Sequence, residues 1–446
     1  MGSCKWWWTS FESESEVRMI NKEVQRIENL IKSCNVVDYK INYKNTSSCE
    51  LYYVLNKLET AREVNVEEIN VTIYKDFDGF KGSSVFTISP GYSDEEIKEK
   101  INNAYERCSY VKNKHFNLPE KEAIDLSSFK SDFDEDLNTV ATNIAKQIFK
   151  ADVYREGWIN STEIFVSKIT NEFLSSKGVS VCYPMTKVML EIIPTWSGEK
   201  EEVELYFTSQ SSKVKYEKIF NQVNNVLENA KNRSEAVKLE NVKSCKVILG
   251  QDEVRSAIKE FTGHLAYSSK FRHMSKYNVG DLIQQGDECD KLTVIAVPYL
   301  ENSTLSSPID SLGTVLKETV LIEDGKAVNM YGDAQSGQYL GVEKPIGAFR
   351  NVLVKPGSKT YAEMTSEPYL ECLYFSSFQM DSFTGYYGGE VRLGIYFDGV
   401  KKVPVTGFSI SGNIYEDINK MRFSKEKASI EGYEGPKYLE VTMSIN

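Results

Sequence analysis

The chain has 446 residues, of which 41% are hydrophobic and 26% charged, and its formal net charge is -11. A chain of this length exceeds one ordinary hydrophobic core, so two or three domains are expected. The acidic balance, without a run rich in Lys and Arg, disfavours nucleic acid as a direct partner. No stretch approaches the length of apolar sequence that a membrane-spanning helix needs, so no membrane span is expected.

Eight cysteines are scattered along the chain without a CxxC pair. This pattern indicates reduced thiols rather than a disulfide framework or a zinc ribbon. The N-terminus lacks the apolar core of a signal peptide. Trp6, Trp7 and Trp8 are expected to pack over the first helix, with a partner-facing anchor as the alternative. A cytoplasmic location is therefore predicted.

Residues 1–112 predict an α+β domain. Ser13 and Glu16 form a capping box at the start of an amphipathic helix. A strand over residues 48–56 follows. Alternating apolar residues on both sides of Asp78-Gly79 then predict a β-hairpin. A second capping box, which begins at Ser93, starts the last helix of this domain.

Residues 113–235 predict a second α+β unit, which opens with a polar linker through residue 130. An amphipathic helical face begins at Leu137. Three strand-like runs and a polar helix complete the unit, at residues 162–173, 180–194, 202–208 and 213–231.

Residues 236–446 predict a β-rich domain. One amphipathic helix, with apolar residues from Val254 to Leu265, precedes a region rich in Gly, Asp and Tyr. Asp324-Gly325 and Asp398-Gly399 are strong hairpin signals, and residues 437–445 alternate as a final strand. The predicted fold class is α+β, with N-terminal and central α+β units followed by a β-rich C-terminal domain.

Histidine is the scarcest residue with catalytic chemistry, and the chain has only His115, His264 and His273. A zinc site needs three or four ligands, usually with two of them close in sequence. The spacing of His264 and His273 matches no simple helical ligand pair. No nucleophile elbow or phosphate-binding loop accompanies them. The simplest interpretation is that each histidine is a hydrogen-bonded structural residue.

One segment stands out as a possible binding wall, Asp381-Ser-Phe-Thr-Gly385 followed by Tyr386 and Tyr387. Its glycine permits a positive φ, and Asp381 and Thr384 can fix a turn through their side chains. A structured loop before a core strand is the alternative to a binding site. The candidate peptide-binding residues are His264, His273, Asp381, Thr384, Gly385, Tyr386 and Tyr387.

Several motifs, in this order, resemble the TldD/PmbA family. The first is the strand-to-helix segment 82–97, and the second is the hairpin Glu318-Thr-Val-Leu-Ile-Glu-Asp-Gly-Lys326. The remaining motifs are Asn351-Val-Leu-Val-Lys-Pro-Gly357, Asp381-Ser-Phe-Thr-Gly385, Pro404-Val405 and Ser411-Gly-Asn413. Together they extend the resemblance over essentially the whole chain.

The resemblance implies three α+β regions and a dimer with an enclosed cavity. TldD-type members carry His-Glu-x-x-x-His and a later cysteine, bind zinc and cleave unfolded peptides, whereas TldE/PmbA-type members lack that motif and act as the partner subunit. The nearest alignment here begins at His264, with Leu265 at the general base and Ser269 at the second ligand. No cysteine follows Asn413. Leucine cannot accept a proton, and one imidazole cannot hold zinc.

We therefore predict a non-catalytic TldE/PmbA-like subunit that holds no zinc of its own. Its expected partners are a TldD-like zinc peptidase subunit or a second copy of itself, and extended peptides. One alternative is a metallopeptidase whose ligands include His264, His273 and either Cys289 or a distant carboxylate. Another is a stand-alone homodimeric protein that binds a peptide or a small ligand.

Overall fold

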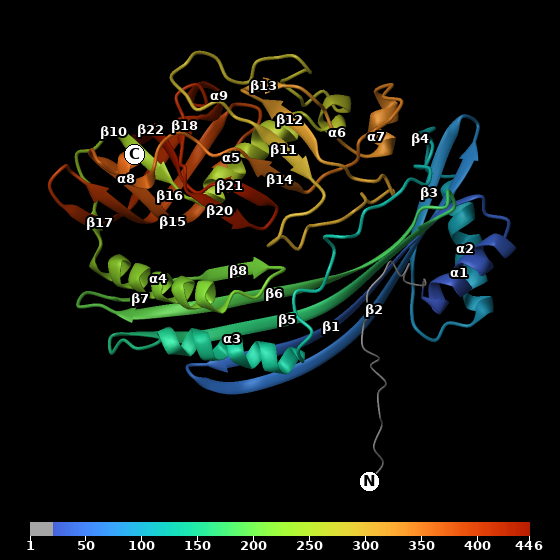
Figure 1. Ribbon diagram of the computed structural model, residues 1–446, viewed down its shortest axis with the longest axis horizontal. Coiled ribbons are helices and arrows are strands. Elements are labelled where there is room, and N and C mark those ends of the chain that lie inside the picture. Colours follow the sequence, from blue (N-terminus) through green and yellow to red (C-terminus); the bar gives the residue numbers. More distant parts are fainter. Residues whose placement is uncertain (1–20) are drawn as a thin grey trace, which may run out of the picture.

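The computed structural model describes residues 21–446, which form an α+β structure in two halves. A long curved sheet with four helices makes up the N-terminal half, and the β-rich C-terminal half lies against one face of that sheet (Figure 1). The predicted fold class is confirmed. The predicted capping box of Ser13 and Glu16 and the three N-terminal tryptophans lie outside the described residues.

The long sheet has the strand order β4-β3-β2-β1-β5-β6-β7, and β8 also pairs with β6. Strand β1 belongs to the first predicted region and β5 to the second, and they pair antiparallel along most of their length. The two regions therefore share one continuous sheet. Its strands are β1 (Asp38–Val54), β2 (Lys57–Phe77), β3 (Phe80–Ile88), β4 (Asn113–Lys114), β5 (Gly157–Ser175), β6 (Ser180–Ser197), β7 (Glu202–Glu204) and β8 (Phe207–Ser211).

Two pairs of helices cover different parts of this sheet (Figure 1). Helices α1 (Lys22–Ser33) and α2 (Asp94–Cys108) bury their apolar faces against β1, β2 and β3. Helices α3 (Leu137–Ala151) and α4 (Tyr216–Glu235) form a second core with β5 and β6. Each cluster also contains residues of the other predicted region, Leu174 in the first cluster and Leu51 in the second.

Local signals in the N-terminal half act as predicted. Ser93 and Glu96 form the capping box of α2 in both directions. Asp78 and Gly79 join β2 to β3 with φ values of 47° and 80°. Two successive residues with positive φ are typical of the hairpin turn whose twist matches the flanking strands.

The C-terminal half contains two sheets around a large hydrophobic core. One has the order β15-β10-β22-β18-β16-β17-β9, and a further pairing of β15 with β16 closes a ring through β10, β22 and β18. The other has the order β13-β12-β11-β14-β21-β20. The predicted hairpins at Asp324-Gly325 and Asp398-Gly399 join β12 to β13 and β16 to β17, and the predicted last strand is β22.

The strands of this half are β9 (Val237–Lys238), β10 (Ser244–Leu249), β11 (Val294–Val297), β12 (Thr319–Glu323), β13 (Lys326–Ala327), β14 (Asn351–Val354), β15 (Tyr369–Met380), β16 (Tyr386–Phe397), β17 (Lys402–Thr406), β18 (Phe408–Asn413), β19 (Arg422–Phe423), β20 (Lys427–Ile430), β21 (Tyr433–Pro436) and β22 (Leu439–Ile445). The helices are α5 (Gln251–His264), α6 (Tyr267–Phe271), α7 (Ala334–Tyr339), α8 (Tyr361–Met364) and α9 (Ile414–Asp417).

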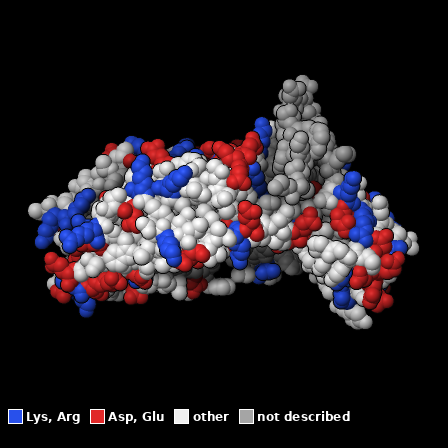
Figure 2. Space-filling view, turned by 90° about the horizontal axis from the view of Figure 1, so that it is seen from below, with Lys and Arg blue, Asp and Glu red and all other residues white. Residues whose placement is uncertain are grey.

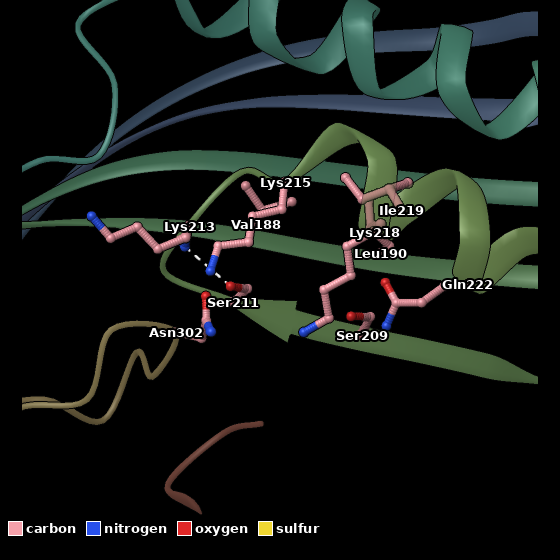
Figure 3. A pocket seen from close by; sticks show the side chains of 10 residues that line it. All are labelled: Val188, Leu190, Ser209, Ser211, Lys213, Lys215, Lys218, Ile219, Gln222 and Asn302. Carbon is pink, nitrogen blue, oxygen red and sulfur yellow. Dashed lines mark hydrogen bonds between the residues drawn. The ribbon is translucent and has the colours of Figure 1, made fainter. Parts of the chain in front are cut away.

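Three lysines line a small pocket at the junction between the halves, where β8 leads into α4 (Figure 3). Lys213 pairs with Asp132 at 3.0 Å, and Lys215 lies 3.6 Å from Glu301 of the C-terminal half. Lys218 Nζ donates to the backbone carbonyl of Ser429 at 3.3 Å. Lys215 and Lys218 therefore contact the C-terminal half from the N-terminal half.

Charge is distributed in small mixed groups over the face seen in Figure 2, where Lys and Arg lie among Asp and Glu around a stretch of uncharged residues. Such a surface lacks the continuous basic patch that a phosphate backbone requires. Within residues 21–446, every helix is too short or too polar to span a bilayer.

Candidate functional site

Helix α5 positions the first residues of the candidate site. Val254, Ile258 and Phe261 recur on one face and are buried in the core of the C-terminal half. Asp252 lies in the first turn, where a negative charge suits the helix dipole. The helix ends at His264, because the next residues turn into the short helix α6.

Glu260 and His264 lie one turn apart on α5 and form an ion pair or hydrogen bond. Glu260 Oε1 is 3.1 Å from His264 Nε2. Only 9% of the Glu260 side chain and 4% of the His264 side chain is exposed. Residues four apart share a helix face, so the backbone of α5 itself brings these two groups together.

Two residues distant in sequence complete the network. Tyr415, on α9, has its hydroxyl 2.7 Å from Glu260 Oε1 and 2.9 Å from His264 Nε2. The same hydroxyl is 2.7 Å from the backbone carbonyl of Ser382. The Ser382 hydroxyl donates to the other carboxylate oxygen of Glu260 at 2.8 Å. Both oxygens of Glu260 are thus engaged by protein groups.

These contacts define the charge state of the network. Burial by itself would raise the pKa of Glu260, but hydrogen bonds from His264, Tyr415 and Ser382 outweigh it and lower the pKa to about 2. Burial and the hydrogen bond to Glu260 raise the pKa of Tyr415. An ionised carboxylate only accepts hydrogen bonds, so the Nε2 atom of His264 carries a proton toward Glu260.

The loop after β15 presents Ser382 to this network. Asp381 Oδ1 accepts the backbone N–H groups of Phe383 and Thr384 at 2.7 and 3.3 Å, and these bonds lower the pKa of Asp381. Thr384 Oγ1 accepts the N–H of Tyr386 at 3.2 Å. The predicted turn chemistry of Asp381 and Thr384 is therefore present, and it shapes the loop that carries Ser382.

Gly385 follows in this loop with a φ of 81°. A Cβ atom at this position would lie 2.5 Å from the Tyr415 ring and 2.6 Å from Asn413 Oδ1. Glycine is therefore required both for the backbone conformation and for the close approach of Tyr415. The carbonyl of Gly385 also accepts the backbone N–H of Ile414 at 2.7 Å, so this residue connects the loop to the helix that carries Tyr415.

The two tyrosines after Gly385 have different surroundings. Tyr387 is 1% exposed, and its hydroxyl donates to Asp417 at 3.0 Å. Burial and this bond raise the pKa of Tyr387. Tyr386 is 43% exposed and lies on the surface. Of this predicted pair, Tyr387 thus acts as a core residue, and Tyr386 keeps an accessible ring.

The remaining candidate residues do not surround one centre. Leu265 is buried as the C-cap of α5, whereas Ser269 lies on α6. His273 is exposed, with a φ of 59°. The alignment that begins at His264 therefore distributes its positions over two helices.

Glu260, Ser382 and Tyr415 were not among the site residues predicted from the sequence. The spacing Glu-x-x-x-His from 260 to 264 was the available signal for Glu260. When His264 is taken as the last residue of the six-residue motif, Glu260 takes the glutamate position and Lys259 takes the first histidine position. This alignment keeps a carboxylate beside the imidazole, which the contact between Glu260 and His264 supports.

These side chains do not fit a zinc ion as they are arranged. Zinc binds the unprotonated nitrogen of imidazole and needs three or more protein ligands. The Nε2 atom of His264 is already engaged by Glu260 and Tyr415. In the described part of the chain, no three His, Cys, Asp or Glu side chains are grouped in a way that could hold a metal ion.

Sequence comparison relates the C-terminal half to peptidases. Residues 242–445 match the PmbA/TldA metallopeptidase C-terminal domain. A metalloprotease of Methanocaldococcus jannaschii is 26% identical over 398 residues, which cover 78% of this chain and 79% of the relative.

Solved structures show that the likeness extends over both halves. TldE from Thermococcus kodakarensis superimposes with a TM-score of 0.75 at 15% identity, covering 94% of this chain and 99% of TldE. A proposed modulator of DNA gyrase from Bacteroides thetaiotaomicron gives a TM-score of 0.80 at 15% identity, covering 96% of this chain and 100% of that protein. The C-terminal half of this chain therefore carries a PmbA/TldA metallopeptidase C-terminal domain, and the whole chain shares the fold of TldE.

Proposed function

We propose that this chain is the non-catalytic subunit of a two-component peptidase. It pairs with a zinc-bearing homologue and helps to hold extended peptides for cleavage by that homologue. The observation that carries this proposal is the closed network of Glu260, His264, Tyr415 and Ser382, in which protein groups occupy the donors and acceptors that a hydrolytic zinc centre would use.

Lys259 supports the same conclusion. An ammonium group at the first ligand position cannot donate a lone pair to zinc at neutral pH. On a regular helix, positions 259 and 264 are separated by roughly 140°. Lys259 is exposed and His264 is buried, as that separation requires. In this structure the two side chains therefore do not face one centre.

Metal analysis of the purified chain and of the variant Lys259→His tests this proposal. We expect both proteins to contain less than about 0.1 zinc per chain, because substituting one ligand leaves the other imidazole engaged and facing elsewhere. Mass spectrometry of the acid-digested proteins measures the zinc, with the zinc-bearing homologue as the positive control. One tightly held zinc per wild-type chain would overturn the proposal.

Co-expression with the zinc-bearing homologue tests the pairing. A one-to-one complex that cleaves an unfolded peptide, together with no cleavage by this chain alone, is the expected result. A stable homodimer that never recovers the homologue favours the stand-alone binding protein. Chelator-sensitive cleavage that disappears in both His264→Ala and His273→Ala would instead favour a peptidase with a different ligand set.

A further inference from the structure

A cleft of about 660 Å³ lies between the long sheet and the C-terminal half. One wall is formed by β1, β2, β5 and β6, and the other by residues 297–311 and 348–351. The volume falls within the range of small-ligand sites, roughly 300 to 1,000 Å³. Contacts between Lys40 and Ser311 and between Tyr183 and Ser307 connect the two walls.

The sheet wall carries polar side chains in register. Lys44 is paired across the sheet with Glu68 on β2 and with Asn171 on β5. Two residues away on β1, Asn42 is paired with Asn70. Directly opposed residues of antiparallel strands point to the same face, and so do residues two apart. The alternation thus places three amide side chains and one ammonium group on the face toward the C-terminal half.

Two donors that line the cleft lack a described protein partner, the buried amide of Asn171 and the exposed guanidinium of Arg350. Asn171 Nδ2 is buried and has no hydrogen-bond partner among residues 21–446. A buried donor without a partner destabilises the free protein. Arg350 also lines the cleft, and no described carboxylate pairs with its guanidinium. Both groups are donors, so a ligand that engages them must supply acceptor atoms.

Most acidic groups of the cleft are already engaged. Asp310 accepts the backbone N–H groups of Leu312, Thr314 and Ala348. Glu172 accepts the backbone N–H of Asn21 at 3.0 Å. Glu68 lies 3.6 Å from Lys44. Arg350 is therefore the cation of this cleft that is left to receive an anionic group from a ligand.

The other cleft residues favour an amphipathic ligand. Met185, Leu305, Leu316 and Phe349 add apolar surface beside the amides. Guanidinium binds carboxylate in a bidentate geometry, and side-chain amides match the carbonyl groups of a peptide backbone. A peptide end combines a carboxylate, backbone carbonyls and apolar side chains.

We propose that this cleft binds the C-terminal end of an extended peptide, with Arg350 receiving the terminal carboxylate and Asn171 Nδ2 donating to a backbone carbonyl. The peptide as ligand class rests on the proposed function, and the site itself rests on the cleft and its unpaired donors. Arg350 is then the residue that determines specificity for a free chain end.

Fluorescence anisotropy with the full chain tests this proposal. The probe is a pool of N-terminally fluorescein-labelled hexapeptides with randomised uncharged residues, made with a free terminal carboxylate and, in parallel, as the terminal amide. We expect the free acid to bind at least about tenfold more tightly than the amide, since the ion pair is lost in the amide. Arg350→Ala should bind both forms like the amide, and Arg350→Lys should restore part of the difference.

Two further variants separate a binding role from a structural one. Asn171→Leu should weaken binding severalfold without lowering the melting temperature, because it removes a donor that is unpaired in the free protein. Arg392→Ala, at an exposed position on β16, is the matched control and should bind like the wild type.

Equal binding of acid and amide, unchanged binding by Arg350→Ala, or no saturable binding of either pool would overturn the proposal. An amidated pool with one internal glutamate that binds as tightly as the free acid would also overturn the assignment to the chain end. Zinc bound to the purified chain would overturn the proposed function but not the cleft as a peptide-end site. Equal binding of acid and amide by a zinc-free chain would overturn only the peptide-end site.

Discussion

Replacing Glu260 with glutamine is expected to lower the free energy of unfolding at pH 7 by about 2 kcal/mol. The carboxylate accepts from His264, Tyr415 and Ser382 in a nearly buried position. Glutamine keeps the shape but loses the charge, and its amide N–H₂ meets groups that also donate. A hydrogen bond to a charged group contributes about 1.5–3 kcal/mol to stability. The glutamine amide can still make weaker hydrogen bonds, so only part of this contribution is lost.

The pH dependence of this effect follows from the lowered pKa. Glu260 has a pKa of about 2 in the folded protein, against an ordinary value of 4.5. A carboxyl group with a depressed folded pKa adds stability above its unfolded pKa, and this contribution is lost as the pH falls through its folded pKa. The difference between wild type and Glu260→Gln should therefore shrink by at least half between pH 7 and pH 3.

Urea unfolding monitored by circular dichroism at both pH values measures the effect. Glu228→Gln, at an exposed position on α4, is the control and should change stability little at either pH. A destabilisation by Glu260→Gln that is the same at pH 7 and pH 3 would show that the carboxylate is not held ionised by the network.

Replacing Gly385 with alanine is expected to destabilise the protein by about 2–4 kcal/mol. A left-handed conformation costs a residue with a Cβ about 1–2 kcal/mol. The new Cβ would also lie 2.5 Å from the Tyr415 ring, so the loop or α9 must move. Because both elements reach Glu260, the strain should also loosen the network. Differential unfolding in urea measures this cost.

Gly79→Ala provides the matched control. Gly79 has nearly the same φ, 80° against 81° for Gly385, but a Cβ there would meet no atom within 4 Å. The control should therefore show only the backbone cost of about 1–2 kcal/mol. Equal losses in the two variants would mean that the contact between Gly385 and Tyr415 is not a tight one.

Local chemistry accounts for what the sequence predicted correctly. The turn at Asp78-Gly79 and the capping box from Ser93 to Glu96 depend on residues within a few positions of each other. The hairpins at Asp324-Gly325 and Asp398-Gly399 are of the same kind. Backbone torsions and side-chain caps act over this range, so these elements could be placed without any knowledge of the fold.

The candidate site is only partly local. Glu260 and His264 are four residues apart in the sequence, so a helix brings them to one face and into contact. Tyr415 and Ser382 lie 155 and 122 residues from Glu260. No periodicity in the sequence links residues so far apart. The turn at Asp381 can be predicted, but not that its Ser382 hydroxyl contacts Glu260.

The sequence by itself determined the family resemblance, the α+β composition, and the turns and caps, because each follows from residue identity or short-range geometry. Only the tertiary structure decided that β1 and β5 join the first two regions in one sheet, that Tyr415 engages Glu260 and His264, and that Arg350 lines the same cleft as the amides of the sheet. Strand pairing and docking of the two halves depend on the apolar surface buried by many residues along the whole chain. No single residue or short motif therefore predicts them.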